Sequence, residues 1–97
     1  MKAVLFSRAA QNDLQDIWVY VASDHPEAAD RLEEDIRHEI EVLSEMPDLG
    51  HRRRDLTTHD LWFHTVRKNY LIVFKRSDPL EIIRILHGAR DAVRELH

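Results

Sequence analysis

The sequence predicts an α+β fold with the element order β-α-α-β-β-β, in which a helical hairpin packs on a small, mainly antiparallel sheet. Apolar residues recur at helical spacing through residues 8–46, and from residue 61 onward the spacing changes to two, which is typical of strands. The chain has 97 residues and contains no linker or internal repeat. We therefore expect one domain, spanning residues 1–97.

The first two elements are a short strand and a helix. The apolar run Lys2–Phe6 predicts the strand, and Ser7 after it is a good N-cap because its hydroxyl can accept a hydrogen bond from a free amide. The helix is expected from Arg8 to about Ser23. Its apolar stripe is Ala10, Leu14, Ile17, Trp18 and Val21. Its wet face is expected to carry Gln11, Asp13, Gln15 and Asp16. We expect Trp18 in the core and Tyr20 exposed.

A second helix begins at Pro26, because proline suits the first helical position, where a missing amide costs no hydrogen bond. Glu27 and Asp30 in its first turn interact favourably with the helix dipole. The helix stops at Met46-Pro47, and its stripe is Ala29, Leu32, Ile36, Ile40 and Leu43. The break between the two helices is short, so they should form an antiparallel hairpin that packs on the sheet.

Three further strands are expected at Leu61–Val66, Tyr70–Lys75 and Leu80–Leu86. Lys68-Asn69 fits a tight turn, since Asn tolerates positive φ, and residues 77–79 fit the next turn. Connections this short make the three strands an antiparallel meander. After Gly88, the segment from Ala89 to Leu96 is expected to be a short helix or a loose tail.

The last strand carries a basic residue, Arg84, inside an apolar run. Alternation places Ile82, Arg84 and Leu86 on one side, and Ile83, Ile85 and His87 on the other. Arg84 and His87 therefore start on opposite faces of the sheet. The structural interpretation of Arg84 is an internal ion pair, and the functional one is a cation presented at the end of the sheet.

The net charge of −4 hides an asymmetry between the two halves. Residues 1–46 carry 4 basic and 11 acidic side chains, whereas residues 47–97 carry 10 basic and 7 acidic ones. Halves this different suggest two faces with different partners. The run Arg52-Arg53-Arg54 is either a solvated loop or a patch that faces an anion.

Several classes of site are excluded or disfavoured. The chain has no cysteine, and its histidines lack the close spacing of a zinc site, so we expect no metal. Two glycines cannot make a glycine-rich phosphate loop, no serine lies in a nucleophile elbow, and we expect no cofactor. No stretch is long and apolar enough to span a membrane, and no signal-peptide pattern is present. We expect a soluble, cytoplasmic protein.

Two functions remain open on the residues alone. Metal-free RNA cleavage needs a base, an acid and cations, and the sheet half offers His64, Arg67, Tyr70, Arg84, His87 and Arg90. Strand alternation disfavours a full set on one face. A binding module is the other option, with an acidic hairpin beside a basic sheet edge. Trp62 or Phe63 would then be an anchor, because alternation turns one of them inward and the other outward.

Five segments, taken in order, resemble ParE-type toxins of the RelE/ParE superfamily, the toxic halves of bacterial type II toxin–antitoxin pairs. The first is Phe6-Ser7-Arg8-Ala9-Ala10 with Asp13-Leu14 and Ile17-Trp18. The others are residues 25–29 (His-Pro-Glu-Ala-Ala), 46–52 (Met-Pro-Asp-Leu-Gly-His-Arg), 70–74 (Tyr-Leu-Ile-Val-Phe) and 82–91 (Ile-Ile-Arg-Ile-Leu-His-Gly-Ala-Arg-Asp). The closing segment is the most specific.

The resemblance implies the same order of elements and a small ParD-like antitoxin as partner, which binds operator DNA itself and wraps the toxin with its C-terminal segment. It also implies inhibition of DNA gyrase rather than catalysis, without cofactor, metal or membrane. Alternatives are ribosome-dependent mRNA cleavage, as in RelE-like members, or a non-toxic relative that only binds antitoxin. The negative net charge and the lack of Tyr after His87 disfavour the nuclease.

No catalytic residue is carried over from the family. The candidates for contact with the target or the antitoxin are Arg52, Arg53, Arg54, Arg84, His87, Arg90, Asp91 and Arg94.

Overall fold

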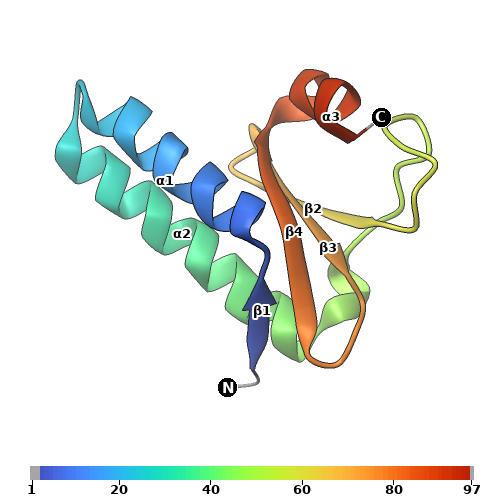
Figure 1. Ribbon diagram of the computed structural model, residues 1–97. Helices are drawn as coiled ribbons and strands as arrows, with labels where there is room; N and C mark the ends of the chain where they lie inside the picture. Colours follow the sequence, from blue (N-terminus) through green and yellow to red (C-terminus); the bar gives the residue numbers. More distant parts are fainter. Residues whose placement is uncertain (1–2, 97) are drawn as a thin grey trace.

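The computed structural model describes residues 3–96 and shows the predicted order of elements (Figure 1). The strands are β1 (Val4–Phe6), β2 (Trp62–Val66), β3 (Tyr70–Lys75) and β4 (Leu80–His87). The helices are α1 (Arg8–Ala22), α2 (Pro26–Glu45) and α3 (Gly88–Leu96), and a short 3₁₀ turn, η1 (Pro47–Leu49), follows α2. The α+β prediction is confirmed. The expected start of the first strand at Lys2 lies outside the described residues.

The strands form one sheet in the order β1-β4-β3-β2. β2, β3 and β4 are antiparallel neighbours, whereas β1 lies parallel to β4, so the mainly antiparallel sheet is confirmed. β1 pairs with β4 at residues 80–82. In the described chain, β4 therefore continues from residue 83 to residue 87 as an edge of the sheet.

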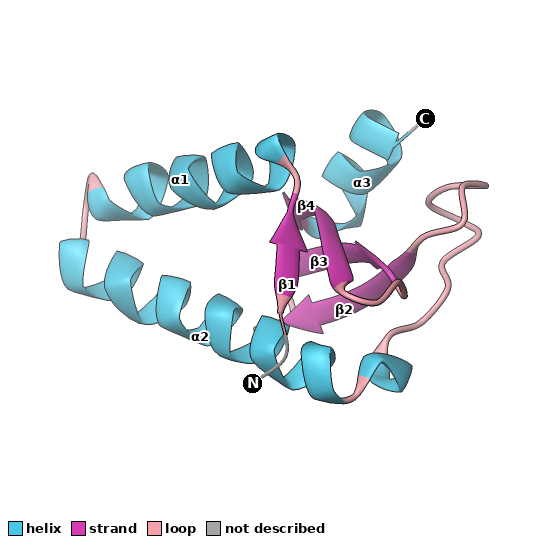
Figure 2. Ribbon diagram, turned by 60° about the horizontal axis from the view of Figure 1, so that its bottom comes forward, coloured by secondary structure: helices cyan, strands magenta, loops and turns pink. Residues whose placement is uncertain are grey.

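The sheet is buried on both faces (Figures 1 and 2). The α1–α2 hairpin covers one face, and α3 covers the other together with the segment 50–61. The core under the hairpin consists of Ala10, Leu14, Leu32, Ile36, Ile40, Leu43, Val66, Ile72, Phe74, Leu80, Ile82 and Ile85. The core under α3 consists of Leu56, Leu61, Phe63, Leu71, Val73, Leu86, Ala92 and Leu96. The last segment is thus a packed helix rather than a loose tail.

The two long helices follow the sequence closely. The hydroxyl of Ser7 accepts a hydrogen bond from the Ala10 amide at 2.9 Å, as expected of an N-cap. The whole predicted stripe of α2 is buried. Tyr20 is 78% exposed, as predicted. Trp18 differs from the prediction, because it is only half-buried and its indole N–H donates to the Asp30 carboxylate at 2.9 Å.

The turn between β2 and β3 begins one residue earlier than predicted. Val66 pairs with Tyr70, and the positive φ angles fall at Arg67 (52°) and Lys68 (64°). Asn69 is therefore not the residue that adopts the left-handed conformation. Two successive left-handed residues give a turn whose twist matches the flanking strands, which favours this arrangement.

A bulge in β4 changes the side-chain alternation that simple parity predicts. Val73 pairs with Arg84 and Phe74 with Ile82, so the residue between these partners has no cross-strand partner of its own. Ile82 consequently packs in the core under the hairpin, together with Ile85. Leu86 packs in the core under α3. The expectation that Ile82 and Leu86 share one side is wrong, because the extra residue reverses the alternation between them.

Candidate functional site

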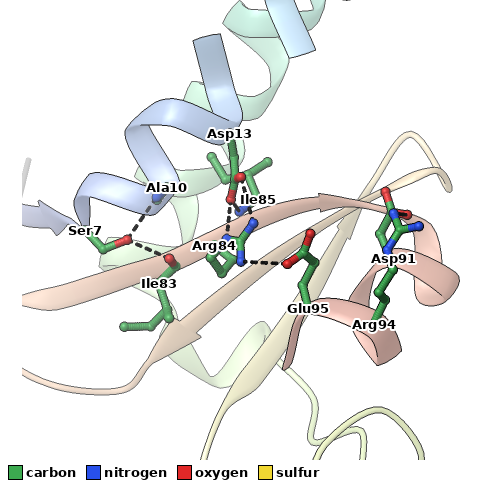
Figure 3. Close-up of polar contacts among 9 residues, drawn as sticks. All are labelled: Ser7, Ala10, Asp13, Ile83, Arg84, Ile85, Asp91, Arg94 and Glu95. Atoms are coloured by element: carbon green, nitrogen blue, oxygen red, sulfur yellow. Dashed lines mark hydrogen bonds and ion pairs between the residues drawn. The ribbon is translucent and has the colours of Figure 1, made fainter. Parts of the chain in front are cut away.

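Arg84, the basic residue inside β4, is held by a carboxylate of α1 (Figure 3). Its Nε donates to Asp13 Oδ2 at 2.7 Å and its Nη2 donates to Asp13 Oδ1 at 3.0 Å. Nη1 lies 3.7 Å from a carboxylate oxygen of Glu95 on α3. The hydrogen bond to Asp13 raises the pKa of Arg84 above its ordinary value. Arg84 thus links α1 and α3 across the sheet edge.

Asp13 does not lie on the wet face predicted for it, since its side chain is only 14% exposed. Its Oδ2 also accepts the backbone N–H of Ile85 at 3.0 Å. The partial burial of Asp13 could have been predicted from its spacing. Asp13 lies three residues after Ala10 and four before Ile17, so it flanks the apolar stripe.

Ser7 forms hydrogen bonds to the same edge of β4, shortly before the residues that Asp13 contacts (Figure 3). Its backbone N–H donates to the Ile82 carbonyl at 2.9 Å, and its hydroxyl donates to the Ile83 carbonyl at 2.6 Å. Ser7 and Asp13 therefore satisfy the Ile83 carbonyl and the Ile85 amide, which lie beyond the residues that pair with β1. An open row of such groups invites pairing with another chain, and these two side chains reduce that liability.

The remaining candidates at the end of β4 are more accessible. The exposed imidazole of His87 stacks on the Tyr70 ring, with centroids 4.8 Å apart and an interplanar angle of 14°. On α3, Arg94 donates to Asp91 at 2.8 Å within the helix. Arg90 is exposed, and within residues 3–96 it has no hydrogen-bond or ion-pair partner. Among the candidate residues of β4 and α3, Arg90 is thus the arginine whose charge is available to another molecule.

The arginine run lies in the loop before β2 and is largely neutralised. Arg52 forms an ion pair with Asp60. Arg53 donates to both carboxylate oxygens of Asp55, at 3.0 and 2.8 Å, and this hydrogen bonding raises the pKa of Arg53 and lowers that of Asp55. Arg54 is exposed and has no partner within the described chain. The run therefore offers one unpaired cation rather than three.

A cation that sequence reasoning missed, Arg76, lies at the end of β3. Its guanidinium lies 3.3 Å from the centroid of the Trp62 ring and donates to the carbonyls of Pro47 and Gly50 at 3.0 and 3.2 Å. Arg52 lies 4.6 Å from the same ring. Trp62 is thus covered by cations while its neighbour Phe63 is buried. The sequence carried no signal that Arg76 would cover Trp62, because this contact depends on the fold of the 47–50 turn.

A groove runs along the free side of β1, between that strand and the two helices. It consists of two adjoining hollows, of about 560 and 390 Å³, which share Phe6 and Arg37. We call it the edge groove. Its apolar lining is Ala3, Val4, Phe6, Leu14, Trp18 and Ile40, and its polar lining is Gln11, Gln15, Glu33, Arg37, Glu41 and Ser44. Leu5, between Val4 and Phe6 on the same strand, lines neither hollow.

Of the residues considered for RNA cleavage, Tyr70 and His87 lie together as the stacked pair, but three other side chains of that set are engaged with other partners in the described chain. His64 bonds to Glu39 at 2.9 Å, Arg67 donates to Asp35, and Arg84 is held by α1. Among residues 3–96, no group of three or more His, Asp or Glu side chains could hold a metal ion. None of the helices in that range combines the length and apolar character needed to cross a bilayer.

Comparison with known proteins yields consistent matches. The model of the family described as the ParE toxin of the type II toxin–antitoxin system parDE matches residues 4–92. Toxin ParE1 of Caulobacter vibrioides is 30% identical over 94 residues, which is 95% of each chain. The protein Y4kP of Sinorhizobium fredii is 28% identical over 87 residues, covering 90% of this chain and 88% of its own.

A solved structure of the chromosomal ParDE system from P. aeruginosa has the same fold, with a TM-score of 0.73 at 23% identity. The match covers 91% of this chain and 97% of the other.

Proposed function

The chain belongs to the ParE toxin family of type II toxin–antitoxin systems, and on this premise we propose which molecules it binds. The protein inhibits DNA gyrase in the cytoplasm and thereby stalls replication. A ParD-like antitoxin neutralises it, and the complex contacts DNA through the antitoxin alone.

The edge groove carries the antitoxin part of the proposal. It combines an apolar floor with a polar rim, and the outer side of β1 is the free edge of the sheet. An extended or helical segment of a partner can add to such an edge and place its apolar side chains in the groove. The apolar lining of the groove from β1, Val4 and Phe6, is only partly buried, and a partner that covers it would remove the remaining apolar surface from water.

Charge supports a second contact with an acidic antitoxin segment. Arg84, Arg52 and Arg53 already have carboxylate partners, so they are poor anchors for another anion. Arg54 and Arg90 are exposed and unpaired within the described chain. We therefore propose that carboxylates of the antitoxin pair with Arg54 and Arg90. Arg84 instead joins α1 and α3 to the sheet within the protein itself.

Inhibition of gyrase is preferred to RNA cleavage because, within residues 3–96, no catalytic set assembles around His87. Arg84, the nearest cation along the strand, is engaged by Asp13 and Glu95 instead of facing the imidazole. Without a cation beside a candidate acid or base, the charge of a phosphorane intermediate is not stabilised.

The first experiment is supercoiling of DNA by purified gyrase, titrated with this protein in the absence of antitoxin. Loss of supercoiling together with trapped cleaved DNA supports the proposal. No inhibition by a folded protein that still stops cell growth would refute the gyrase assignment. Cleavage of message on translating ribosomes, abolished by His87→Ala, would establish the nuclease instead. Normal growth on expression alone would indicate a relative that only binds antitoxin.

The groove is tested with Gln15→Trp, measured against a ParD-like antitoxin that protects cells from the protein. Gln15 is an exposed residue of α1 that lines the groove, so a bulky ring there would occupy the hollow. We expect affinity to fall at least about tenfold, because the ring would displace antitoxin side chains from the groove. Asn12→Trp is the matched control, since Asn12 is exposed on the same helix and lines neither hollow. Equal affinities of the two variants would argue against the edge groove as the antitoxin site.

A further inference from the structure

A third hollow lies at the far end of β4, between α1 and the paired ends of β3 and β4. Its volume is about 190 Å³, and it is lined by Asp16, Ile17, Tyr20, Tyr70 and His87. None of these residues lines the edge groove. The hollow, which we call the aromatic pocket, is therefore a separate site.

The walls of the aromatic pocket are rings held in fixed relation to the fold. Tyr70 on β3 and His87 on β4 are cross-strand partners, and their rings lie nearly parallel with centroids 4.8 Å apart. Tyr70 also packs against the core under the hairpin, which anchors the pair. Tyr20 on α1 completes the pocket, although 78% of its surface is exposed. Tyrosine is one of the residues enriched in binding hot spots.

The lining contains one carboxylate, that of Asp16. This side chain is exposed, and within residues 3–96 it has no hydrogen-bond or ion-pair partner. Its neighbour along α1, Asp13, is by contrast fully engaged with Arg84. Because no arginine or lysine lines the aromatic pocket, the negative charge of Asp16 is not compensated there.

We propose that the aromatic pocket binds the side chain of an arginine or lysine from a protein partner. The faces of tyrosine rings attract a cation, and the Asp16 carboxylate supplies the opposite charge at the rim. Size supports a single side chain, since about 190 Å³ is below the roughly 300–1,000 Å³ of pockets that hold small-molecule ligands. A nucleotide is disfavoured, because Asp16 would repel its phosphate.

This inference does not depend on the identity of the target or of the antitoxin, because the probe is the cationic group itself. The protein is titrated with N-acetyl-arginine methylamide while the ring protons of Tyr70 and His87 are followed by NMR. The neutral probe is the corresponding citrulline derivative, which has nearly the same shape without the charge. We expect saturable shifts with the arginine derivative and none with the citrulline derivative.

Two variants test whether the arginine derivative binds in the aromatic pocket. Asp16→Asn should weaken arginine binding about threefold or more, as loss of an ion pair at a partly exposed site predicts. Tyr20→Ala should weaken it further by removing one ring. Asp24→Asn is the matched control, because Asp24 is exposed in the turn after α1 and its loss changes the net charge equally. It should leave the affinity unchanged.

Three results would overturn the inference. Equal shifts with the arginine and citrulline derivatives would show that charge is not recognised. Equal weakening by Asp16→Asn and Asp24→Asn would show that only the overall field of the protein acts. Saturable shifts of the same rings with uridine or adenosine monophosphate, but not with the arginine derivative, would identify a nucleotide site instead.

Discussion

The ion pair between Asp13 and Arg84 should be the largest polar contribution to the stability of this fold. Asp13→Ala removes two charged hydrogen bonds, at 2.7 and 3.0 Å, and leaves the Ile85 amide without its acceptor. Breaking a buried pair costs about 3–5 kcal/mol, and an unsatisfied amide costs about 1–3 kcal/mol.

The expected loss is smaller than the sum of these terms. The two side chains keep 21% and 14% of their exposure, and Glu95 remains near Arg84 as a weaker partner. We therefore expect Asp13→Ala to lower the free energy of unfolding by about 2–4 kcal/mol. A domain of this size has about 5–15 kcal/mol in total, so the variant should still fold.

The assay is urea unfolding followed by tryptophan fluorescence and circular dichroism, arranged as a double-mutant cycle with Arg84→Met. The two substitutions should show a coupling energy of about 1.5–3 kcal/mol, because the residues act as one unit. Asp55→Ala is the matched control, since it breaks an equally bidentate pair that is exposed, and its unfolding midpoint should not change measurably. A coupling energy below about 0.5 kcal/mol, the usual error of additivity, would refute this account of Arg84.

Three further outcomes are expected. Ser7→Ala should lower the free energy of unfolding by about 1–2 kcal/mol, because the N-cap and the bond to the Ile83 carbonyl are lost together, whereas Ser7→Thr should recover most of it. Gly50→Ala should cost about 1–3 kcal/mol in the same urea assay, since the added methyl would overlap the buried ring of Phe74, and an unchanged midpoint would mean that the ring can move. Arg90→Glu should weaken antitoxin binding about tenfold in calorimetry without changing the melting temperature, and equal affinity would remove Arg90 from the interface.

Much of the fold could be predicted from the sequence, because its signals are local. The position of Ser7 after an apolar run, the stripe of α2 and the start of that helix at Pro26 depend on neighbours within a few residues. The change of period after residue 61 likewise predicted the meander of three strands. Short connections then left few ways to arrange these elements.

The candidate site was only partly predictable, because contacts between distant segments decide which charges are free. Arg84 and Arg90 have the same charge and lie in the same closing segment, yet Arg84 is engaged by α1 and Arg90 is exposed. Arg76 and Trp62 meet the 47–50 turn only in the folded chain.

By itself, therefore, the sequence determined the order and type of the elements up to β4 and the family to which the chain belongs, whereas the type of the last segment stayed open. Only the tertiary structure decided the faces of β4, because one extra residue opposite Val73 and Phe74 reverses an alternation that otherwise has a period of two. It also decided that Asp13 and Ser7 bond to the edge of β4 where β1 ends, and that the edge groove stays open beside β1. Within the described part of the chain, it leaves Asp16 without a partner. Propensity and periodicity act over a few residues, whereas the pairing of a charge depends on segments as much as 71 residues apart.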